Sequence, residues 1–162
     1  MSRGVQVAVS GGGADPRPED LEAAEEVGRL LAEHGATVVC GGLGGIMEAV
    51  ARGAAGAGGE VIGILPGTDP AEASEHCTRV VATGTGHARN LAVVASADAV
   101  IAIAGEWGTL SEIAFARRLG RPVVTLGSWE VSGAGEMQRA PGIEAAGSPA
   151  AAVEAAMSRL ER

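Results

Sequence analysis

Short apolar runs bounded by glycine alternate with amphipathic stretches along most of this chain. The apolar runs predict strands at residues 4–10, 36–40, 60–65, 78–82, 99–104 and 122–126. Nearly continuous apolar strands are typical of parallel sheets that helices cover on both faces, because neither face then meets water. The pattern therefore predicts an α/β fold in three α/β/α layers, with a doubly wound parallel sheet of six or seven strands.

The amphipathic stretches predict the helices that connect these strands. We expect the first helix to begin after Pro16 and Pro18 and to end near Gly35, and the others to cover residues 45–57, 87–96, 108–119 and 149–160. Residues 127–148 are rich in Gly, Ser and Ala and have no clear periodicity, so we expect a loop or lid there. No repeat or linker divides the chain, which indicates one domain over residues 1–162.

Composition excludes two classes of chemistry. All 12 basic residues are Arg, because the sequence contains no Lys. The chain therefore lacks both the Schiff-base amine of pyridoxal-phosphate catalysis and the lysine of a Walker A loop. Since 46% of the residues are hydrophobic but only 2% are aromatic, Ala and branched aliphatic side chains must build the core.

Charge and cysteine content limit the partners. The formal net charge of −8 disfavours a nucleic-acid partner, because an acidic surface repels a polyphosphate backbone. One small anion remains compatible, since backbone N–H groups at helix N-termini bind phosphate whatever the total charge. No apolar run is long enough for a membrane span or a signal sequence, so no membrane partner is expected. Cys40 and Cys77 have neither CxxC nor zinc-finger spacing, so we expect reduced, buried thiols and a cytoplasmic protein. No His has ligand spacing with another His or with a Cys, so we expect no metal site, and we expect no cofactor.

Three predicted strands end in glycine clusters, which are Ser10-Gly11-Gly12-Gly13, Gly41-Gly42-Leu43-Gly44-Gly45 and Gly105-Glu106-Trp107-Gly108-Thr109. The carboxyl ends of parallel strands meet at one edge of a sheet, so these loops are expected to converge on one ligand. A turn that needs positive φ explains each cluster alone equally well, but the three together favour a nucleotide or sugar phosphate. No cluster spells GxGxxG, and an NAD site would have an acid near Cys40, so a mononucleotide is preferred.

Three side chains near these loops are candidates for chemistry. Arg89 begins a predicted helix and is placed to bind a phosphate in a forked geometry, with a surface position as the alternative. Glu112 is either the partner of Thr109 in a capping box or a carboxylate that polarises water or stabilises a ribosyl cation. Trp107 either stacks on a base or packs across a dimer interface. Other polar or soft side chains nearby are interpreted as structural or solvated, namely Met47, His87 and Asn90.

The order and spacing of these motifs resemble the LOG ("lonely guy") family of nucleoside 5′-monophosphate phosphoribohydrolases, long mislabelled as lysine decarboxylases. The motifs are Gly41-Gly42-Leu43-Gly44-Gly45-Ile46-Met47, Arg89-Asn90 and Gly105-Glu106-Trp107-Gly108-Thr109-Leu110-Ser111-Glu112, within residues 5–126. The resemblance implies a Rossmann-like fold and a homodimer. It also implies hydrolysis of the N-glycosidic bond of a nucleoside 5′-monophosphate, such as a cytokinin riboside monophosphate or AMP, to free base and ribose 5-phosphate. The absence of Lys argues independently against a decarboxylase.

The family hallmark PGGxGTxxE assigns roles by resemblance. Gly105, Gly108, Thr109 and Glu112 match it, which implies that Glu112 is the catalytic carboxylate and that Gly108 and Thr109 contact the phosphate. Arg89 matches the essential Arg of the family.

Three positions depart from this pattern. Ala104 and Glu106 replace the proline and the second glycine of the hallmark, and Asn90 stands where plant-type members carry Lys. The Arg-Asn pair looks closer to a bacterial subgroup, some relatives of which resemble molybdenum-cofactor carrier proteins. The alternative to a hydrolase is therefore a carrier that holds a pterin phosphate without cleaving it, or a module that senses a nucleotide.

Overall fold

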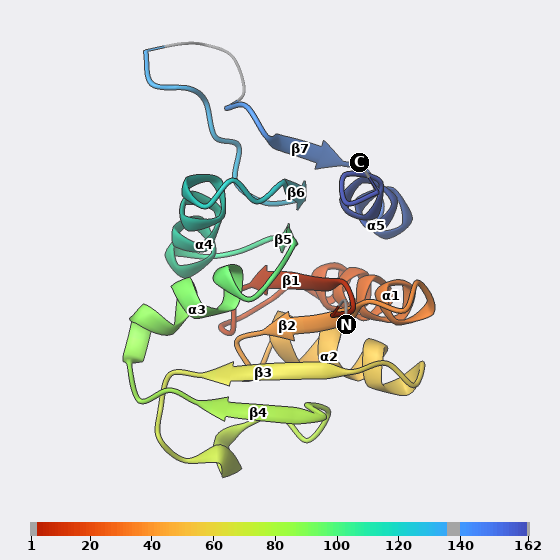
Figure 1. The fold of residues 1–162 in the computed structure, drawn as a ribbon, viewed down its shortest axis with the longest axis vertical. Coiled ribbons are helices and arrows are strands. Elements are labelled where there is room, and N and C mark those ends of the chain that lie inside the picture. Colours follow the sequence, from red (N-terminus) through yellow and green to blue (C-terminus); the bar gives the residue numbers. More distant parts are fainter. Residues whose placement is uncertain (1–2, 136–139, 162) are drawn as a thin grey trace.

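The computed structural model describes residues 3–135 and 140–161, which form one seven-stranded sheet flanked by helices (Figure 1). The strand order is β4-β3-β2-β1-β5-β6-β7, and every neighbouring pair is parallel. The strands are β1 (Gln6–Gly11), β2 (Thr37–Cys40), β3 (Val61–Leu65), β4 (Arg79–Ala82), β5 (Ala99–Ile103), β6 (Val123–Leu126) and β7 (Ile143–Ala146). The predicted three-layer, doubly wound parallel fold is confirmed, with seven strands.

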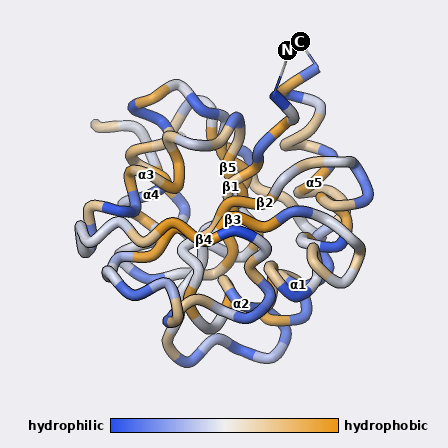
Figure 2. The backbone as a smooth tube through the Cα atoms, turned by 60° about the horizontal axis from the view of Figure 1, so that its bottom comes forward, coloured by the Kyte–Doolittle hydropathy of each residue, from blue (hydrophilic) through white to orange (hydrophobic). Residues whose placement is uncertain are grey.

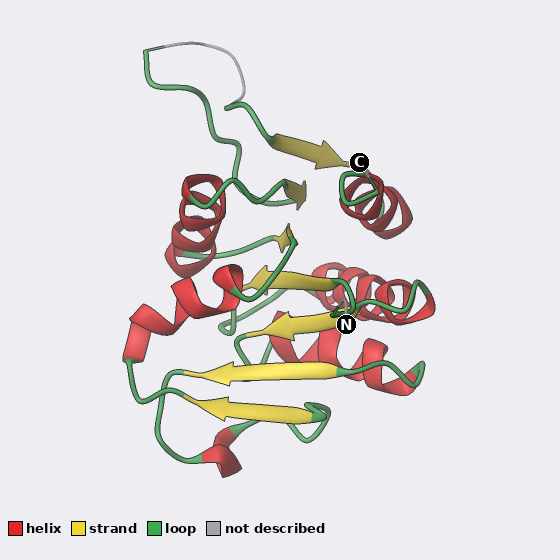
Figure 3. Cartoon of the chain, viewed as in Figure 1, coloured by secondary structure: helices red, strands yellow, loops and turns green. Residues whose placement is uncertain are grey.

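Helices cover both faces of this sheet (Figure 3). On one face lie α1 (Pro18–Glu33), α2 (Ile46–Gly56) and α5 (Pro149–Ser158). On the other face lie α3 (Arg89–Ala95) and α4 (Trp107–Arg118). Two short 3₁₀ turns complete the elements, η1 (Pro70–Glu72) and η2 (Gly86–Ala88).

The core consists of aliphatic side chains from the central strands and from the helices that cover them, as the composition predicts. Figure 2 shows hydrophobic residues along β1, β2, β3 and β5, and all of β5 is inaccessible to solvent. Each fully buried Val or Ile side chain contributes about 1.5–3 kcal/mol by leaving water. The continuous apolar runs therefore indicated burial on two faces correctly, because both sides of β5 meet a helical layer.

The segment at residues 127–148 corrects one prediction. We expected a loop or lid, but the segment includes β7, which pairs with β6. Its sequence, Ile-Glu-Ala-Ala, gave no strand signal because β7 lies at the sheet edge and only Ile143 is buried. The part of the predicted lid around Met137 lies outside the described residues.

The strand order fixes where a ligand site forms. From β1 the chain builds outward through β2, β3 and β4, and then returns to place β5 on the other side of β1. Where the order of strands reverses in this way, the loops after neighbouring strands diverge and leave a crevice at the carboxyl edge of the sheet. Here that crevice lies beyond the ends of β1 and β5.

Candidate functional site

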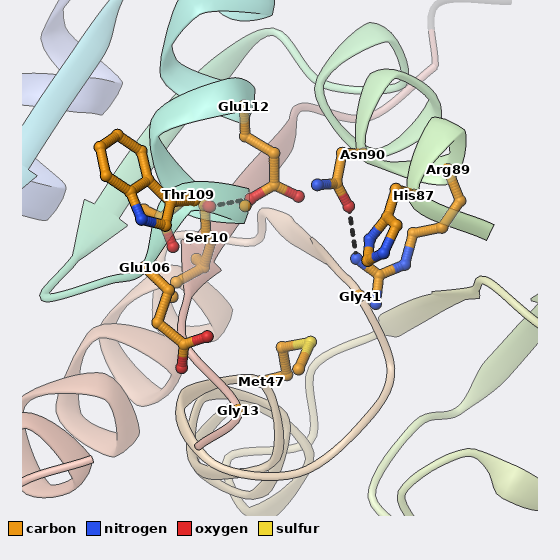
Figure 4. A pocket seen from close by; sticks show the side chains of 15 residues that line it. Ser10, Gly13, Gly41, Met47, His87, Arg89, Asn90, Glu106, Thr109 and Glu112 are labelled. Atoms are coloured by element: carbon orange, nitrogen blue, oxygen red, sulfur yellow. Dashed lines mark hydrogen bonds between the residues drawn. The ribbon is translucent and has the colours of Figure 1, made fainter. Parts of the chain in front are cut away.

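One pocket of about 340 Å³ opens at this carboxyl edge. Figure 4 shows its labelled side chains converging from four separate segments of the chain. The segments follow β1, β2 and β5 or begin α3. The lining residues are Val9, Ser10, Gly11, Gly12, Gly13, Gly41, Met47, His87, Arg89, Asn90, Glu106, Trp107, Gly108, Thr109 and Glu112.

Most residues singled out in the sequence lie in this pocket, including Arg89 and Glu112. Three predicted glycines do not line it. Gly42 lies against Leu65 of β3, and Gly44 has open space around it. Gly105 adopts a φ of 118°, and a Cβ there would lie 2.6 Å from the Thr109 side chain. Gly42 and Gly105 have positive φ and serve the turn geometry, which is the alternative that each cluster alone had left open, whereas nothing in the structure explains glycine at position 44.

The start of α4 tests the capping interpretation of Glu112. The helix begins at Trp107, so Thr109 lies inside its first turn and is not the N-cap residue. The predicted capping box is therefore absent. Instead Glu112, which is 6% exposed, accepts a hydrogen bond from the Ser10 hydroxyl at the end of β1. The Glu112 carboxyl group is thus available to the pocket rather than to the helix backbone.

Burial changes the protonation of Glu112. Removal from water raises the pKa of its carboxyl group to about 8, while the positive charge of Arg89 opposes this shift. At neutral pH the carboxyl group is therefore largely protonated. A carboxylic acid in this state donates a proton or a hydrogen bond, and it does not repel an anion in the same pocket.

Arg89 supplies the positive charge of the pocket. Its Nη1 donates to Asn90 Oδ1 at 2.6 Å, and its Nε is buried with no hydrogen-bond partner among the described residues. Burial lowers the pKa of the guanidinium from its ordinary value, which still leaves it charged at neutral pH. Among the residues that the structure describes, no carboxylate forms an ion pair with it. A half-buried cation of this kind has donors left for an anionic ligand.

Asn90 holds Arg89 in place, a role that the sequence did not reveal. Asn90 is 6% exposed, and its Nδ2 donates to Ser111 Oγ at 3.1 Å, which links α3 to α4. Met47 and His87 also line the pocket, although we had interpreted both as structural or solvated. Both residues lie next to the motifs in the sequence, which was a signal that they could line the pocket. The direction of their side chains depends on the residues at which α2 and η2 begin, which the sequence does not determine.

Glu106 brings a second carboxylate to the rim. Its Oε1 accepts a hydrogen bond from the Ala14 backbone N–H at 3.1 Å, and a Cβ on Gly12 would lie 2.6 Å from the same oxygen. Glu106, which replaces the second glycine of the hallmark, thus accepts the hydrogen bond of a backbone N–H group beside the first glycine loop. It places negative charge next to the expected phosphate position.

The pocket rim also carries an aromatic pair. Trp107 is 76% exposed, and its ring centroid lies 5.1 Å from that of Trp129 at an interplanar angle of 37°. Trp129 Nε1 donates to Glu106 O at 3.1 Å, which fixes the second indole beside the loop. An exposed indole at the mouth of a pocket offers a face for a planar ring.

Within the described ranges, no three His, Cys, Asp or Glu side chains gather as a metal site. In the same ranges, no helix has both the length and the apolar character to span a membrane.

Comparisons with known proteins agree with both resemblances seen in the sequence. A probable cytokinin riboside 5′-monophosphate phosphoribohydrolase from Oryza sativa is 39% identical over 94 residues, which are 56% of this chain and 38% of the rice protein. The molybdenum cofactor binding protein of Rippkaea orientalis is 32% identical, with a TM-score of 0.89 over 99% of each chain. The molybdenum cofactor carrier protein of Chlamydomonas reinhardtii is 30% identical, with a TM-score of 0.84 over 99% of this chain and 100% of that one.

The family assignment rests on almost the whole chain. Residues 4–153 match the SLOG cluster4 family, and this range contains all seven strands and every residue of the pocket. The motifs that resemble the LOG family therefore lie within a family-wide match rather than in an isolated segment. The chain belongs to the SLOG cluster4 family.

Proposed function

We propose that the protein binds a nucleoside 5′-monophosphate and hydrolyses its N-glycosidic bond, which releases the free base and ribose 5-phosphate. One observation carries this proposal. A half-buried Arg89 without an ion-pair partner among the described residues shares a glycine-lined pocket with a buried, protonated Glu112. A cation for the phosphate and a proton for the leaving base are the two groups that this reaction needs.

The phosphate binds between the Gly11–Gly13 loop and the N-terminus of α4 at Gly108 and Thr109. The first N–H groups of a helix have no partner within the helix, and the helix dipole makes this end positive. α4 begins at Trp107, so the N–H groups of Gly108 and Thr109 belong to this free set. Arg89 adds a forked donor from the opposite wall.

The base lies toward the rim, against the indole of Trp107. Purines and pterins are both planar, so stacking on an exposed indole suits either ring system. Trp129 stabilises the position of Trp107 through the ring contact described above.

Glu112 acts as a proton donor and then as a base. It donates its proton to a ring nitrogen of the departing base as the C1′–N bond breaks and its electron pair moves to the base. A water molecule then adds to the ribosyl cation at C1′, and the resulting carboxylate takes one proton from that water. The balance is one nucleotide and one water consumed, with one base and one ribose 5-phosphate formed. Ser10 orients the Glu112 carboxyl group through its hydroxyl.

A product assay tests this reaction. The full chain is incubated with AMP and with adenine-type riboside 5′-monophosphates, and free base and ribose 5-phosphate are quantified. We expect turnover that falls on the order of a hundredfold or more in Glu112→Gln, while Glu22→Gln, an exposed control on α1, retains it. Base release at equal rates in Glu112→Gln and the wild type would rule out the role of Glu112.

A second candidate, a molybdenum-cofactor carrier, is supported by a specific observation. The two molybdenum-cofactor proteins match this chain over at least 99% of their lengths. A carrier would copurify with a pterin or molybdate and would release no base. Mass spectrometry of ligand extracted from protein expressed in a host that makes the cofactor separates the two functions.

The third candidate function is a module that binds a nucleotide as a signal and catalyses no reaction. It would bind a nucleotide without releasing base and without copurifying pterin. Isothermal titration calorimetry across a panel of nucleotides tests it, and no binding to any of them would exclude it.

A homodimer is also part of the proposal. The outer layer exposes Leu91 on α3, Phe115 on α4 and Leu119 just after the end of α4, each more than a third accessible in the single chain. Apolar side chains on neighbouring helices form the kind of surface that a second copy covers. We further propose that the protein works in the cytoplasm, where Cys40 and Cys77 are reduced in the absence of an oxidant.

A further inference from the structure

The two cysteines of the chain come together behind the pocket. Cys40 is the last residue of β2 and is buried, whereas Cys77 lies just before β4 and is half-buried. Both are free thiols, and Cys77 packs against the core cluster that contains Cys40. The function proposed above uses neither of them.

Gly63 explains how the two sulfur atoms become neighbours. Cys40 pairs with Gly63 of β3 in the parallel ladder, so these positions face the same side of the sheet on strands about 4.8 Å apart. A Cβ on Gly63 would lie only 2.7 Å from Cys77 Sγ. The Cys77 sulfur therefore fills the space that a side chain at position 63 would occupy, next to the side chain of Cys40.

This thiol pair adjoins the wall of the pocket. Cys40 precedes Gly41, where a Cβ would lie 2.9 Å from the Arg89 Cζ. The segment before Cys77 is held to the same strand end, because the Ser74 backbone N–H donates to Gly42 O at 2.8 Å. A covalent link between the sulfurs would join the β3–β4 connection to the end of β2.

The two thiols differ in reactivity. The neighbouring Cys40 thiol lowers the pKa of the Cys77 thiol, and the same interaction, together with burial, raises the pKa of the Cys40 thiol. Cys77 is also the more accessible of the two. The accessible thiol is thus the one with more thiolate, which is the nucleophilic form of cysteine.

We propose that Cys40 and Cys77 form a redox-active dithiol that a peroxide oxidises to an intrachain disulfide. The Cys77 thiolate attacks one peroxide oxygen, the O–O bond breaks, and the other oxygen leaves as water or an alcohol after taking a proton. Cys77 is then a sulfenic acid. The Cys40 sulfur attacks the Cys77 sulfur, the S–O bond breaks, and the hydroxide leaves as water with the Cys40 proton. This site is independent of the ligand proposed for the pocket.

The test uses the reduced full chain and one equivalent of hydrogen peroxide. We expect both thiols to disappear together in a thiol titration, with a loss of two hydrogens in the intact mass and a peptide that links Cys40 to Cys77. In Cys40→Ser, Cys77 is expected to stop at a sulfenic acid that dimedone traps. In Cys77→Ser, Cys40 is expected to stay reduced and to be alkylated about tenfold or more slowly than Cys77 in the wild type. Disulfides between chains, or oxidation of Cys77 beyond sulfenic acid while Cys40 stays free, would overturn the proposal.

A glycine pair tests the geometric basis. Gly63→Ala introduces a methyl group into the space of the Cys77 sulfur, so disulfide formation is expected to slow about tenfold or more. Gly56→Ala is the matched control, because a Cβ on Gly56 meets no atom within 4 Å. Should Gly63→Ala form the disulfide as fast as Gly56→Ala, the assigned neighbourhood of Cys77 is wrong.

Discussion

The buried carboxyl group of Glu112 predicts a specific dependence of stability on pH. In the folded chain its pKa is about 8, whereas in the unfolded chain it returns to an ordinary value of 4.5. Between these two values the unfolded state releases a proton that the folded state retains. The contribution of Glu112 to the free energy of unfolding is therefore fully present below about pH 4.5 and is lost as the pH rises through about 8.

The magnitude follows from the two pKa values. At about 1.4 kcal/mol for each pKa unit, the difference between 4.5 and about 8 corresponds to about 5 kcal/mol as an upper limit. Local rearrangement and water entry stabilise the carboxylate once it forms, so we expect a measured loss on the order of 3 kcal/mol. This is a large share of the stability of a domain of this size.

Urea unfolding of the wild type, Glu112→Gln and the control Glu22→Gln over about pH 5 to 9 measures this contribution. The amide in Glu112→Gln does not titrate but keeps an acceptor for the Ser10 hydroxyl, so the variant is expected to match the wild type near pH 5 and to be more stable by about 3 kcal/mol near pH 9. Glu22→Gln is expected to follow the wild type throughout. Parallel curves for Glu112→Gln and the wild type would refute a raised pKa at this position and, with it, the proton-donor role.

Four further variants test the parts of the pocket and the outer face. Arg89→Ala is expected to weaken the binding of ribose 5-phosphate about tenfold to a hundredfold in calorimetry, because a charge-assisted contact is lost; unchanged affinity would exclude Arg89 as the phosphate ligand. Trp107→Ala is expected to weaken AMP binding about threefold to tenfold and to leave ribose 5-phosphate unaffected, since only AMP carries a base to stack; an equal loss for both ligands would contradict stacking. Glu106→Gln is expected to tighten phosphate binding about twofold to fivefold at low salt, with the gain shrinking at high salt, because a nearby negative charge is removed; weaker binding would show that its carboxylate supports the loop. Phe115→Glu is expected to give a monomer in light scattering where the wild type is a dimer, and a dimer that persists would place the interface elsewhere.

The convergence of the three loops was predictable from sequence because it depends on topology. Parallel strands that alternate with helices must send their carboxyl ends to one edge, so Ser10 and Gly108 meet although they are far apart in the chain. The type of each strand was also readable, since burial on both faces produces continuous apolar runs such as Ala99–Ile103. The roles of the residues within the pocket stay predictions.

The remaining features of the site depend on the residue at which each helix begins and on the direction of individual side chains, which the sequence pattern does not determine. A capping box at Thr109 and Glu112 required the helix to begin at Leu110, three residues later than it does, and the early start at Trp107 left Glu112 available to Ser10. Asn90 was interpreted only as structural or solvated, and the spacing did not indicate that its buried side chain would donate to Ser111 of α4. The contact of Cys77 with the Gly63 position depends on the β2–β3 register and on the path of a long connection, neither of which is written in the spacing of the cysteines.

β7 was not predicted because an edge strand buries few side chains, so its sequence carries no apolar pattern. An edge strand has one neighbour, and Glu144 and Ala145 are exposed, so selection for apolar residues is weak there. Its position is determined by pairing with β6 and by the packing of α5, which are tertiary contacts.

The carboxyl-edge pocket is proposed to hold the phosphate of a small ligand, and every role assigned to its residues depends on that placement. A crystal structure of the protein with ribose 5-phosphate tests it. We expect the phosphate within hydrogen-bond distance of the N–H groups of Gly108 and Thr109 and of the Arg89 guanidinium, with C1′ directed toward Glu112. A phosphate bound elsewhere on the chain would contradict this placement. A ribose bound in the pocket with its C1′ directed away from Glu112 would also contradict it.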